Sequence, residues 1–462
     1  MLKKFIGDKA FYSRVTVITL PVLIQNIITN FVSLLDNIMV GQLGTEQMTG
    51  VAVANQLVFV FSICIFGGIS GPGIFTAQYY GKNDMKGVRD TFRFKIIIVA
   101  ALTFIGTLLC IFLREPLISL FLHEGEEGLD IAKTLEYGSH YLLLAMIQFL
   151  PFAIMQAYAG TLREMGNTII PMIAGVAAVI INTSLNYVLI FGKFGAPMLG
   201  ITGAAIATIT ARIIECLIVV LTTHIKSEKF SFIKGAYRSM KIPYDLTVKI
   251  IKKGFPLMVN EMLWSMGTVT LVQCYSVRGL EVVSAYNISS TVSNLFHCAF
   301  FAFGSTISII VGQLLGSGDL KRAKDESTKL LALVTVICVI MGTLMAVLAP
   351  AIPEVYNTQQ YVKDLACEFL IISAVLMPIH GFSHGAYFTL RSGGKTGITF
   401  LFDSGYMWVI AIPCAFVLSR FTSFPIIPLF LAVQAMDTVK CILGFILVKK
   451  GIWINNLVSD DN

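Results

Sequence analysis

The sequence predicts an all-α, polytopic membrane protein of about twelve transmembrane helices. Hydrophobic residues make up 56% of its 462 residues and charged residues only 13%. A soluble globular domain carries about a quarter charged residues, roughly twice the fraction found here. Mean hydropathy is +0.78. Apolar segments long enough to cross a bilayer recur about twelve times along the chain. A soluble protein is therefore excluded.

The predicted spans follow the chain at regular intervals and leave short connections between them. They cover residues 16–40, 52–76, 95–113, 137–159, 169–191, 201–222, 250–275, 286–312, 328–349, 365–388, 398–418 and 425–448.

The distribution of Lys and Arg predicts the orientation of the chain. The basic residues concentrate at the N-terminus, at 82–95, at 226–253, at 321–329 and at the C-terminal end of the last span. These segments alternate with connections poor in basic residues, which places both termini in the cytoplasm and requires an even number of crossings. This bias accounts for the net charge of +7 without a nucleic-acid partner. We expect a multi-pass protein of a bacterial plasma (inner) membrane.

The chain contains an internal repeat. At an offset of 235 residues, Pro21 and the residues after it match Pro256 and the residues after it, including Gly44 with Gly279 and Gly81 with Gly316. At an offset of 228, TLREMGNT (161–168) matches TLRSGGKT (389–396). Such self-similarity indicates two copies of one unit.

The repeat predicts two six-helix bundles. We expect an N-terminal lobe at 1–225, a basic cytoplasmic linker at 226–253 that runs into the seventh helix, and a C-terminal lobe at 254–462. Because each copy has an even number of spans, the repeat is parallel, with a pseudo-twofold axis along the membrane normal. Secondary transporters are commonly built in this way, whereas enzymes rarely need such symmetry, so we expect no enzyme.

The first span carries a polar face along an otherwise apolar helix. Its polar residues fall within an arc of about 140° at 100° per residue; they are Gln25, Asn26, Thr29, Asn30, Ser33, Asp36 and Asn37. A carboxylate within a span costs about 2.5–3.5 kcal/mol on insertion scales, so Asp36 is a functional-site hypothesis. The alternative is an acid that only joins two helices by hydrogen bonds.

The second half carries different acids at related positions. At the 235 offset, the polar face reappears with Asn260, Glu261 and Trp264, but Leu271 stands at the position of Asp36. A carboxylate beside an indole can meet a cationic substrate. Asp403, in the eleventh span, is a further candidate for substrate or proton involvement. The alternative for Glu261 is a packing role against a neighbouring helix.

Other titratable residues favour local neutralisation over catalysis or metal binding. Arg212 and Glu215 are three residues apart, as are Asp437 and Lys440, which is the spacing of an ion pair on one helix face. His380 and His384 have the spacing of two metal ligands but lack an evident third ligand. We therefore expect no metal site and no cofactor other than a coupling ion.

The chain resembles the multidrug and toxic compound extrusion (MATE) transporters. The motifs that carry the resemblance are DNIMVGQLG (36–44) after Pro21, the QYYGKND and QLLGSGD loops (78–84 and 313–319), and the two TLR loops. The resemblance as a whole covers about residues 10 to 450. The resemblance implies an antiporter that exports amphipathic, often cationic compounds in exchange for H⁺ or Na⁺.

In some branches of that family, a polar network joins the acid of the first helix to two residues one turn apart on the fifth helix and a Thr on the sixth. The matching positions here are Asp36, Asn182, Asn186 and Thr208. The second acid of that network is replaced by Asn186, so Asp36 alone would bind or release the ion. Asn182 and Asn186 share a helix face, and amides can serve either protonation state; the alternative is interhelical hydrogen bonding without coupling.

We therefore predict a secondary active antiporter that works by alternating access. Asp36, Asn182, Asn186 and Thr208 form the ion-coupling set; the substrate-binding set comprises Gln25, Asn26, Asn30, Asn260, Glu261, Trp264 and Asp403. The expected partners are a small-molecule substrate and the lipid bilayer, and we expect a monomer. The alternative is a flippase for lipids or lipid-linked oligosaccharides, which would need several cations to meet a pyrophosphate.

Overall fold

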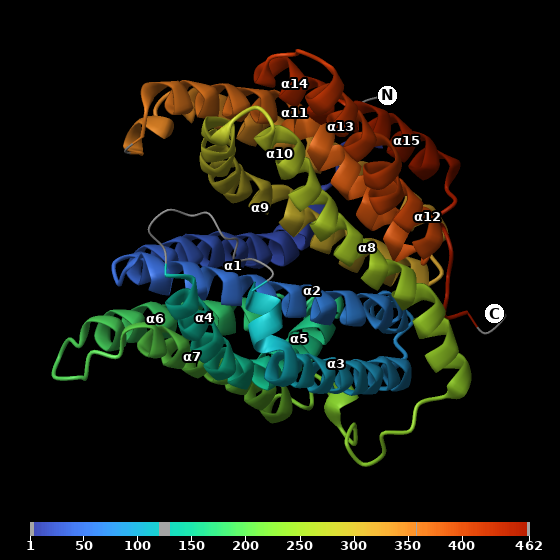
Figure 1. Ribbon diagram of the computed structural model, residues 1–462. Helices are drawn as coiled ribbons and strands as arrows, with labels where there is room; N and C mark the ends of the chain where they lie inside the picture. The colour runs from blue at the N-terminus through green and yellow to red at the C-terminus, as the bar shows by residue number, and fades with distance from the viewer. Residues whose placement is uncertain (1–3, 120–129, 357, 460–462) are drawn as a thin grey trace. The chain divides into compact units, whose positions relative to one another are not determined.

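The computed structural model describes residues 4–119, 130–356 and 358–459, and these residues form helices and connecting turns with no strand (Figure 1). The helices are α1 (Lys9–Gly41), α2 (Thr45–Gly81), α3 (Met85–Ser119), α4 (Ile131–Ala145), α5 (Phe149–Glu164), α6 (Ile169–Phe191), α7 (Gly200–Ile225), α8 (Tyr244–Ser276), α9 (Leu280–Gly316), α10 (Leu320–Leu348), α11 (Gln360–Ser392), α12 (Thr396–Phe400), α13 (Ile412–Phe421), α14 (Ile426–Ala435) and α15 (Asp437–Lys450).

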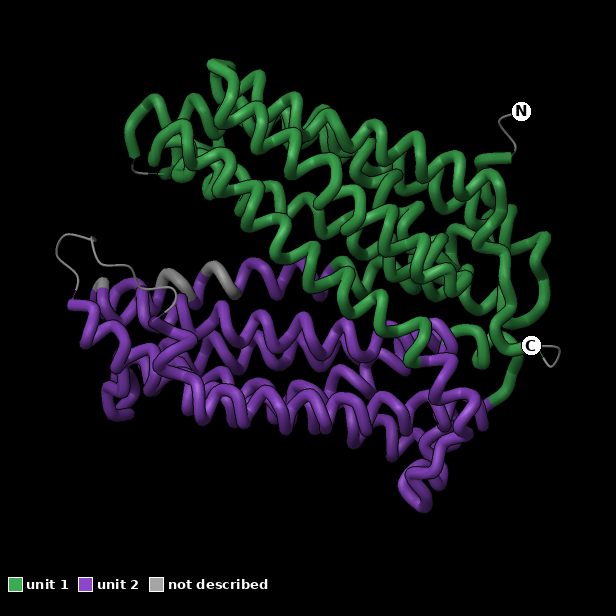
Figure 2. Tube along the Cα trace, turned by 45° about the vertical axis from the view of Figure 1, so that its right-hand side comes forward, with its two compact units in different colours: residues 1–23, 77–84, 251–462 green, residues 24–76, 85–250 purple. Residues whose placement is uncertain are grey.

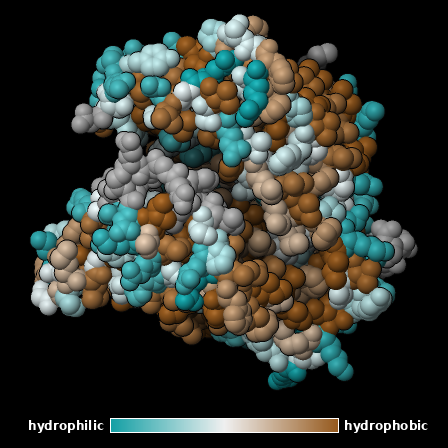
Figure 3. Space-filling view, in the orientation of Figure 1, coloured by the Kyte–Doolittle hydropathy of each residue, from teal (hydrophilic) through white to brown (hydrophobic). Residues whose placement is uncertain are grey.

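The predicted membrane spans are confirmed as helices. Within the described residues, eleven helical stretches are long and apolar enough to cross a membrane. The remaining predicted span, 250–275, lies on α8, whose polar residues lower its hydropathy. Apolar side chains cover much of the face in Figure 3, and several large ones are strongly exposed, such as Phe112 (76%) and Val409 (74%). Lipid would cover such side chains.

Three spans are interrupted. A 3₁₀ turn at Met146–Gln148 separates α4 from α5, and Met436 separates α14 from α15. The eleventh span passes through two π-helical segments, η5 (Leu401–Gly405) and η6 (Met407–Ala411), between α12 and α13. π-helical turns are uncommon and often occur at functional sites.

The internal repeat is visible in the helix boundaries. Helices α1 and α8 both have 33 residues, α2 and α9 both have 37, and each pair starts and ends at the offset of 235. Gly44 and Gly279, between the paired helices, have φ angles of +134° and +127°, which L side chains rarely adopt. Helices α5 and α11 end at the offset of 228. The chain is thus built from two copies of one helical pattern.

The chain packs as two compact units (Figure 2). Unit 1 comprises residues 1–23, 77–84 and 251–462, and unit 2 comprises residues 24–76 and 85–250. The core of unit 1 includes Phe303, Ile307 and Leu331, and that of unit 2 includes Ile65, Phe149 and Ala204. Because α1 and α2 each contribute to both units, the units are not continuous in sequence. The lobe boundaries predicted above stay a prediction.

In unit 1, the end of α2 crosses the end of α9 at two glycines related by the repeat. A Cβ on Gly81 would overlap the backbone of Gln313, and a Cβ on Gly316 would overlap the backbone of Gln78. The segment after α15 packs over this crossing: Leu457 N donates to Gln78 Oε1 at 2.7 Å, and Gln78 Nε2 donates to the Ser392 carbonyl at 3.0 Å. The two loops with a shared motif therefore take part in one contact.

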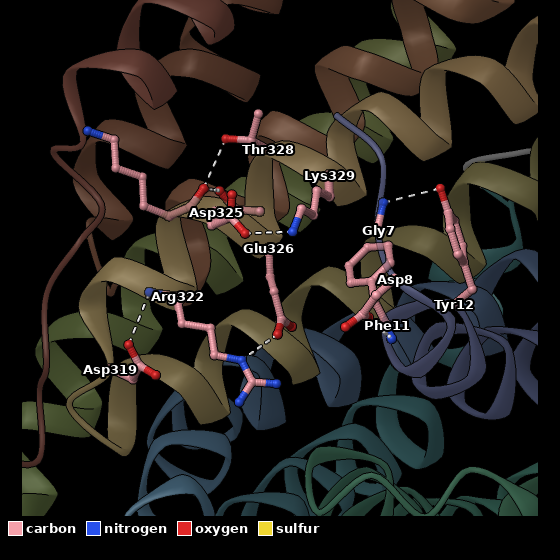
Figure 4. A network of polar contacts seen from close by, with 12 residues as sticks. Gly7, Asp8, Phe11, Tyr12, Asp319, Arg322, Asp325, Glu326, Thr328 and Lys329 are labelled. Carbon is pink, nitrogen blue, oxygen red and sulfur yellow. Dashed lines mark hydrogen bonds and ion pairs between the residues drawn. The ribbon is translucent and has the colours of Figure 1, made fainter. Parts of the chain in front are cut away.

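Polar residues at the start of α10 and near the start of α1, also within unit 1, form hydrogen bonds and ion pairs (Figure 4). Arg322 Nε donates to Glu326 Oε1 at 2.7 Å, and Arg14 Nη1 lies 3.5 Å from Glu326 Oε2. Lys329 Nζ donates to Asp325 Oδ2 at 2.6 Å. Among the described residues, these groups form a cluster that does not include the predicted site residues.

Candidate functional site

The predicted ion-coupling residues lie together in unit 2. Asn186 Nδ2, on α6, donates to Asp36 Oδ1, on α1, at 2.7 Å. One turn earlier on α6, Asn182 Oδ1 accepts from the same amide at 3.3 Å, and Asn182 Nδ2 donates to Thr208 Oγ1, on α7, at 3.2 Å. Asn182 and Asn186 are buried, and Asp36 is partly buried. Three helices thus contribute to one polar cluster.

The Asn182 amide can serve this cluster in two orientations. With its oxygen and nitrogen exchanged, the nitrogen donates to Asp36 Oδ2 at 2.8 Å and the oxygen accepts from Thr208 Oγ1 at 3.2 Å. Asn186 Oδ1 is buried and accepts no hydrogen bond from the described residues. The cluster therefore has spare acceptor capacity next to its single acid.

The charge of Asp36 is not neutralised by a direct ion pair among the described residues. Arg212 on α7 interacts with Asp36 electrostatically, but its guanidinium Nη1 pairs with Glu215 Oε2 at 2.8 Å. The Arg212–Glu215 pair predicted from the sequence is thereby confirmed. Asp36 has a neutral amide as its hydrogen-bond partner instead.

The other predicted residues of the first span have different surroundings. Gln25 Oε1 accepts from Arg163 Nη2, on α5, at 3.2 Å, and Gln25 also packs against Gly175 of α6. Asn26 is half-buried and Asn30 is exposed. The role of these three residues in substrate binding stays a prediction. The side chains of Ser33 and Asn37 lie outside the described residues.

In unit 1, Asn260 of α8 joins two further helices. Its Nδ2 donates to Asp403 Oδ2, in η5, at 2.9 Å and to the Tyr387 hydroxyl, on α11, at 3.2 Å. Its Oδ1 accepts from the backbone N–H of Ser404 at 3.2 Å and from the Ser404 hydroxyl at 2.8 Å. A π-helical turn alters the usual backbone pairing, and the Asn260 amide here satisfies Ser404 N–H. Asn260 therefore fixes the position of Asp403.

Both acids of this unit 1 network have a cationic partner. Lys440 Nζ, on α15, donates to Asp403 Oδ1 at 2.6 Å. Arg391 Nη1, on α11, lies 3.6 Å from Glu261 Oε1, which also accepts from the Tyr387 hydroxyl at 3.2 Å. These contacts link Glu261, Asp403 and their cations through Tyr387 and Asn260. The predicted residues Asn260, Glu261 and Asp403 are thus brought together.

One sequence-based pairing is wrong. Asp437 and Lys440, three residues apart on α15, were expected to pair with each other, but Lys440 pairs with Asp403 and Asp437 Oδ2 lies 3.4 Å from His380 Nε2. The Asp403 side chain is 13% exposed and that of Asp437 is 35% exposed, and a charge pair is stronger where less water surrounds it. Trp264 is 38% exposed, and its role in substrate binding stays a prediction.

Sequence reasoning did not identify Tyr387, Ser404, Lys440 and Tyr141 as members of these clusters. Tyr141, on α4, is buried, and its hydroxyl interacts with Thr208 and Asn55. The repeat offered a signal for Arg391, because Arg391 matches Arg163 at the 228 offset and both arginines reach the polar stretch after a helix proline. Lys440 matches Arg212 at the same offset, but Arg212 pairs within its own helix, so the repeat did not indicate that Lys440 would pair with Asp403.

A separate pocket of about 730 Å³ lies in unit 2 at the ends of α3, α4 and α7, with lining residues that include Arg114, Glu136 and His140. None of the predicted site residues lines it.

The MatE family profile matches residues 21–188 and 256–417, which is most of the chain and both copies of the repeat. The chain belongs to the MatE family. Its relatives include the probable multidrug resistance protein YoeA of Bacillus subtilis (strain 168), which is 24% identical over 92% of this chain and 90% of its own length. The probable multidrug resistance protein NorM of Thermotoga maritima is 22% identical over 94% of this chain and 92% of its own length.

A solved MATE structure, described as a complex with MaL6, matches the fold with a TM-score of 0.85 at 17% identity. The match covers 98% of both chains. The MatE family comprises multidrug efflux transporters of the membrane, so the chain is an all-α, multi-pass membrane transporter.

Proposed function

We propose that this MatE family protein is a secondary active antiporter that exports amphipathic, often cationic compounds from a bacterial cell in exchange for H⁺ or Na⁺. The relatives named as probable multidrug resistance proteins support the class of substrate. The plasma membrane, with both termini in the cytoplasm, is the proposed location, and the protein acts by alternating access without catalytic chemistry.

The observation that carries the proposal is the Asp36 cluster. An acid within a membrane helix is costly in its charged form, and Asp36 has no ion-pair partner among the described residues to offset that cost. Its partner is an amide at 2.7 Å, which can donate to the carboxylate. Binding of a cation, either a proton or Na⁺, would neutralise the acid and change the packing of α1, which carries a proline at position 21.

The groups around Asp36 fit either ion. A proton needs only the carboxylate, whereas Na⁺ needs several oxygen ligands. The buried oxygen of Asn186 and the oxygens of Asn182 and Thr208 are available near Asp36. One charge crossing 100 mV supplies about 2.3 kcal/mol, enough for roughly a fifty-fold substrate gradient.

The flippase alternative is not favoured. A site for a pyrophosphate needs several cations that are not already neutralised. Arg391 and Lys440 do lie in the unit 1 network, but each is paired with a carboxylate. The network therefore presents no excess of positive charge.

The experiment that tests the proposal is substrate efflux in inverted vesicles, with pH and sodium gradients imposed separately. We expect one of the two gradients to drive transport in the wild-type protein. Asp36→Asn removes the ionisable group while keeping its size, and it is expected to abolish the response to that gradient. Asp364→Asn, which removes an exposed acid of α11, is the matched control. Undiminished gradient-driven transport by Asp36→Asn would refute the role of Asp36.

A further inference from the structure

Asp403, an acid of unit 1, is already paired with a cationic side chain of the same chain, that of Lys440. Lys440 Nζ donates to Asp403 Oδ1 at 2.6 Å and lies 5.5 Å from the centre of the Phe402 ring. The side chains of Lys440 and Asp403 are 16% and 13% exposed. The pair is therefore partly desolvated, where a charge interaction is strong, without being fully buried.

The remaining charges of the network are also balanced. Glu261 is 19% exposed at its side chain and faces Arg391 at 3.6 Å. Together, Asp403, Glu261, Lys440 and Arg391 carry a formal charge of zero; Asp437, which also acts on Lys440 electrostatically, lies 3.4 Å from His380 Nε2. A ligand with a single positive charge would have to displace Lys440 or Arg391, or add an uncompensated charge to a poorly solvated site.

A ligand that carries both signs meets no such penalty. Its amine can pair with Asp403 or Glu261 while its carboxylate pairs with the cation that the amine displaces. Asn260 and Tyr387, which lie between the two acids, hold them in place through hydrogen bonds of 2.9 Å and 3.2 Å. The pairs can thus exchange partners without a change in net charge.

We propose that Lys440 is a specificity-determining residue and that it makes the unit 1 site selective for zwitterionic amphiphiles over singly charged cations of similar shape. This inference rests on the proposed function, because it assigns the substrate class of the exporter. Within the repeat, Lys440 matches Arg212 at the 228 offset, and Arg212 pairs with Glu215 of its own helix.

Arg212 and Lys440 occupy matching positions, and both are basic, so the difference between the halves lies in their partners. Arg212 is neutralised within α7, whereas Lys440 reaches across to η5 and neutralises a candidate substrate-binding acid. Only in unit 1 does this basic residue change the charge of the predicted site directly.

The experiment measures binding of two fluorescent probes to the detergent-solubilised full-length protein. Nα-dansyl-L-lysine is a zwitterion, and its methyl ester is a cation of nearly the same shape. We expect the wild-type protein to bind the zwitterion at least tenfold more tightly than the ester. Lys440→Gln leaves one acid uncompensated and is expected to shift this ratio at least tenfold towards the ester.

Two further variants separate a charge effect from damage to the fold. Asp403→Asn/Lys440→Gln restores the charge balance, and its binding ratio is expected to return towards that of the wild type. Lys329→Gln breaks a Lys–Asp pair with the same 2.6 Å separation on α10, and it is expected to leave the ratio unchanged. Thermal unfolding of each variant verifies that it is folded.

The inference is overturned if folded Lys440→Gln keeps the wild-type ratio, if the double variant behaves like the single one, or if the wild-type protein binds neither probe. Because binding is measured without an ion gradient, its result is separate from the test of the proposed function. An absence of gradient-driven efflux would refute the antiporter and leave a charge-dependent binding ratio intact.

Discussion

The acids of the two units differ in what neutralises them. In unit 2, Asp36 receives a hydrogen bond from the amide of Asn186 and has no direct ion pair among the described residues. In unit 1, Asp403 is paired with Lys440, and Glu261 lies near Arg391. An acid with a neutral partner can gain and lose a cation, whereas an acid with a tethered cation is already neutralised. We therefore propose that ion exchange belongs to unit 2 and substrate selection to unit 1.

The arginines of the TLR loops show the same contrast at matching positions. Arg163 and Arg391 coincide at the 228 offset. Arg163 donates to the amide of Gln25, and Arg391 faces the carboxylate of Glu261. The two partners occupy neighbouring positions of the repeated helix, because Gln25 matches Asn260 at the 235 offset. A shared scaffold thus presents a neutral partner in one half and an acid in the other.

The largest expected effect comes from removing the acid that has no cation. Asp36→Asn is expected to lower gradient-driven efflux on the order of 100-fold, because the exchangeable charge is lost. Glu261→Gln is expected to change substrate affinity several-fold while transport still responds to the gradient. Both variants are measured in proteoliposomes with the gradient identified for the wild type. Equal losses of coupling in the two variants would contradict the division of roles.

The next expected effect is on the free energy of unfolding, where the unit 1 variant is expected to lose more than the unit 2 variant. Asp403→Asn leaves the Lys440 ammonium without its counter-ion, and breaking a buried pair costs about 3–5 kcal/mol. Asp36→Asn removes no ion pair, so we expect a change within about 1 kcal/mol. Thermal or denaturant unfolding in detergent measures both.

The double variant Asp403→Asn/Lys440→Gln supplies the control for this measurement. It removes both charges at once and is expected to recover most of the stability that Asp403→Asn loses, because replacing a buried pair costs less than breaking one. If the double variant is as unstable as the single one, the ion pair is not the source of the loss.

Much of the fold could be predicted from the sequence because the repeat and the apolar spans are local patterns. Pro21 with Pro256 and Gly44 with Gly279 marked the paired helices, and their boundaries coincide in the structure. The interruptions could not be predicted. The π-helical turn at Asp403 depends on Ser404 pairing with Asn260, on a helix 144 residues away in the sequence.

The membership of the polar clusters was only partly predictable for the same reason. Asp36, Asn182, Asn186 and Thr208 were predicted together through the family resemblance, and they are close in the structure. Lys440 was assigned to the wrong acid because spacing along one helix reports only neighbours on that helix. Whether Lys440 pairs with Asp437 or with Asp403 depends on tertiary packing. In the structure, Lys440 Nζ lies 2.6 Å from Asp403 Oδ1.

A smaller effect is expected where the two copies of the repeat agree. Gly81 and Gly316 occupy matching positions at the crossing of α2 and α9, and a Cβ on either would overlap the backbone of the facing helix. Alanine at each position is expected to destabilise the protein by about 1–3 kcal/mol, as overpacking does, and by similar amounts at the two positions. Gly397→Ala is the control, because a Cβ there meets no atom within 4 Å. A large difference between the two glycine variants would show that the halves do not share this contact equally.

The smallest expected effect tests helix capping, which also occurs in both units. Asp130 Oδ1 accepts from Lys133 N at 3.1 Å at the start of α4, and Asp319 Oδ1 accepts from Arg322 N at 3.1 Å at the start of α10.

The hydrogen bonds from Lys133, first from its backbone N–H and then from its side chain, hold the pKa of Asp130 below its usual value. Its contribution to stability is therefore fully present above the unfolded pKa of about 3.9 and is lost as the pH falls through the lower folded value. Asp130→Ala is expected to lower the Tm slightly at pH 7, and the difference from the wild type is expected to shrink below about pH 4. A difference that stays constant through this acidic range would mean that the carboxylate does not act as the cap.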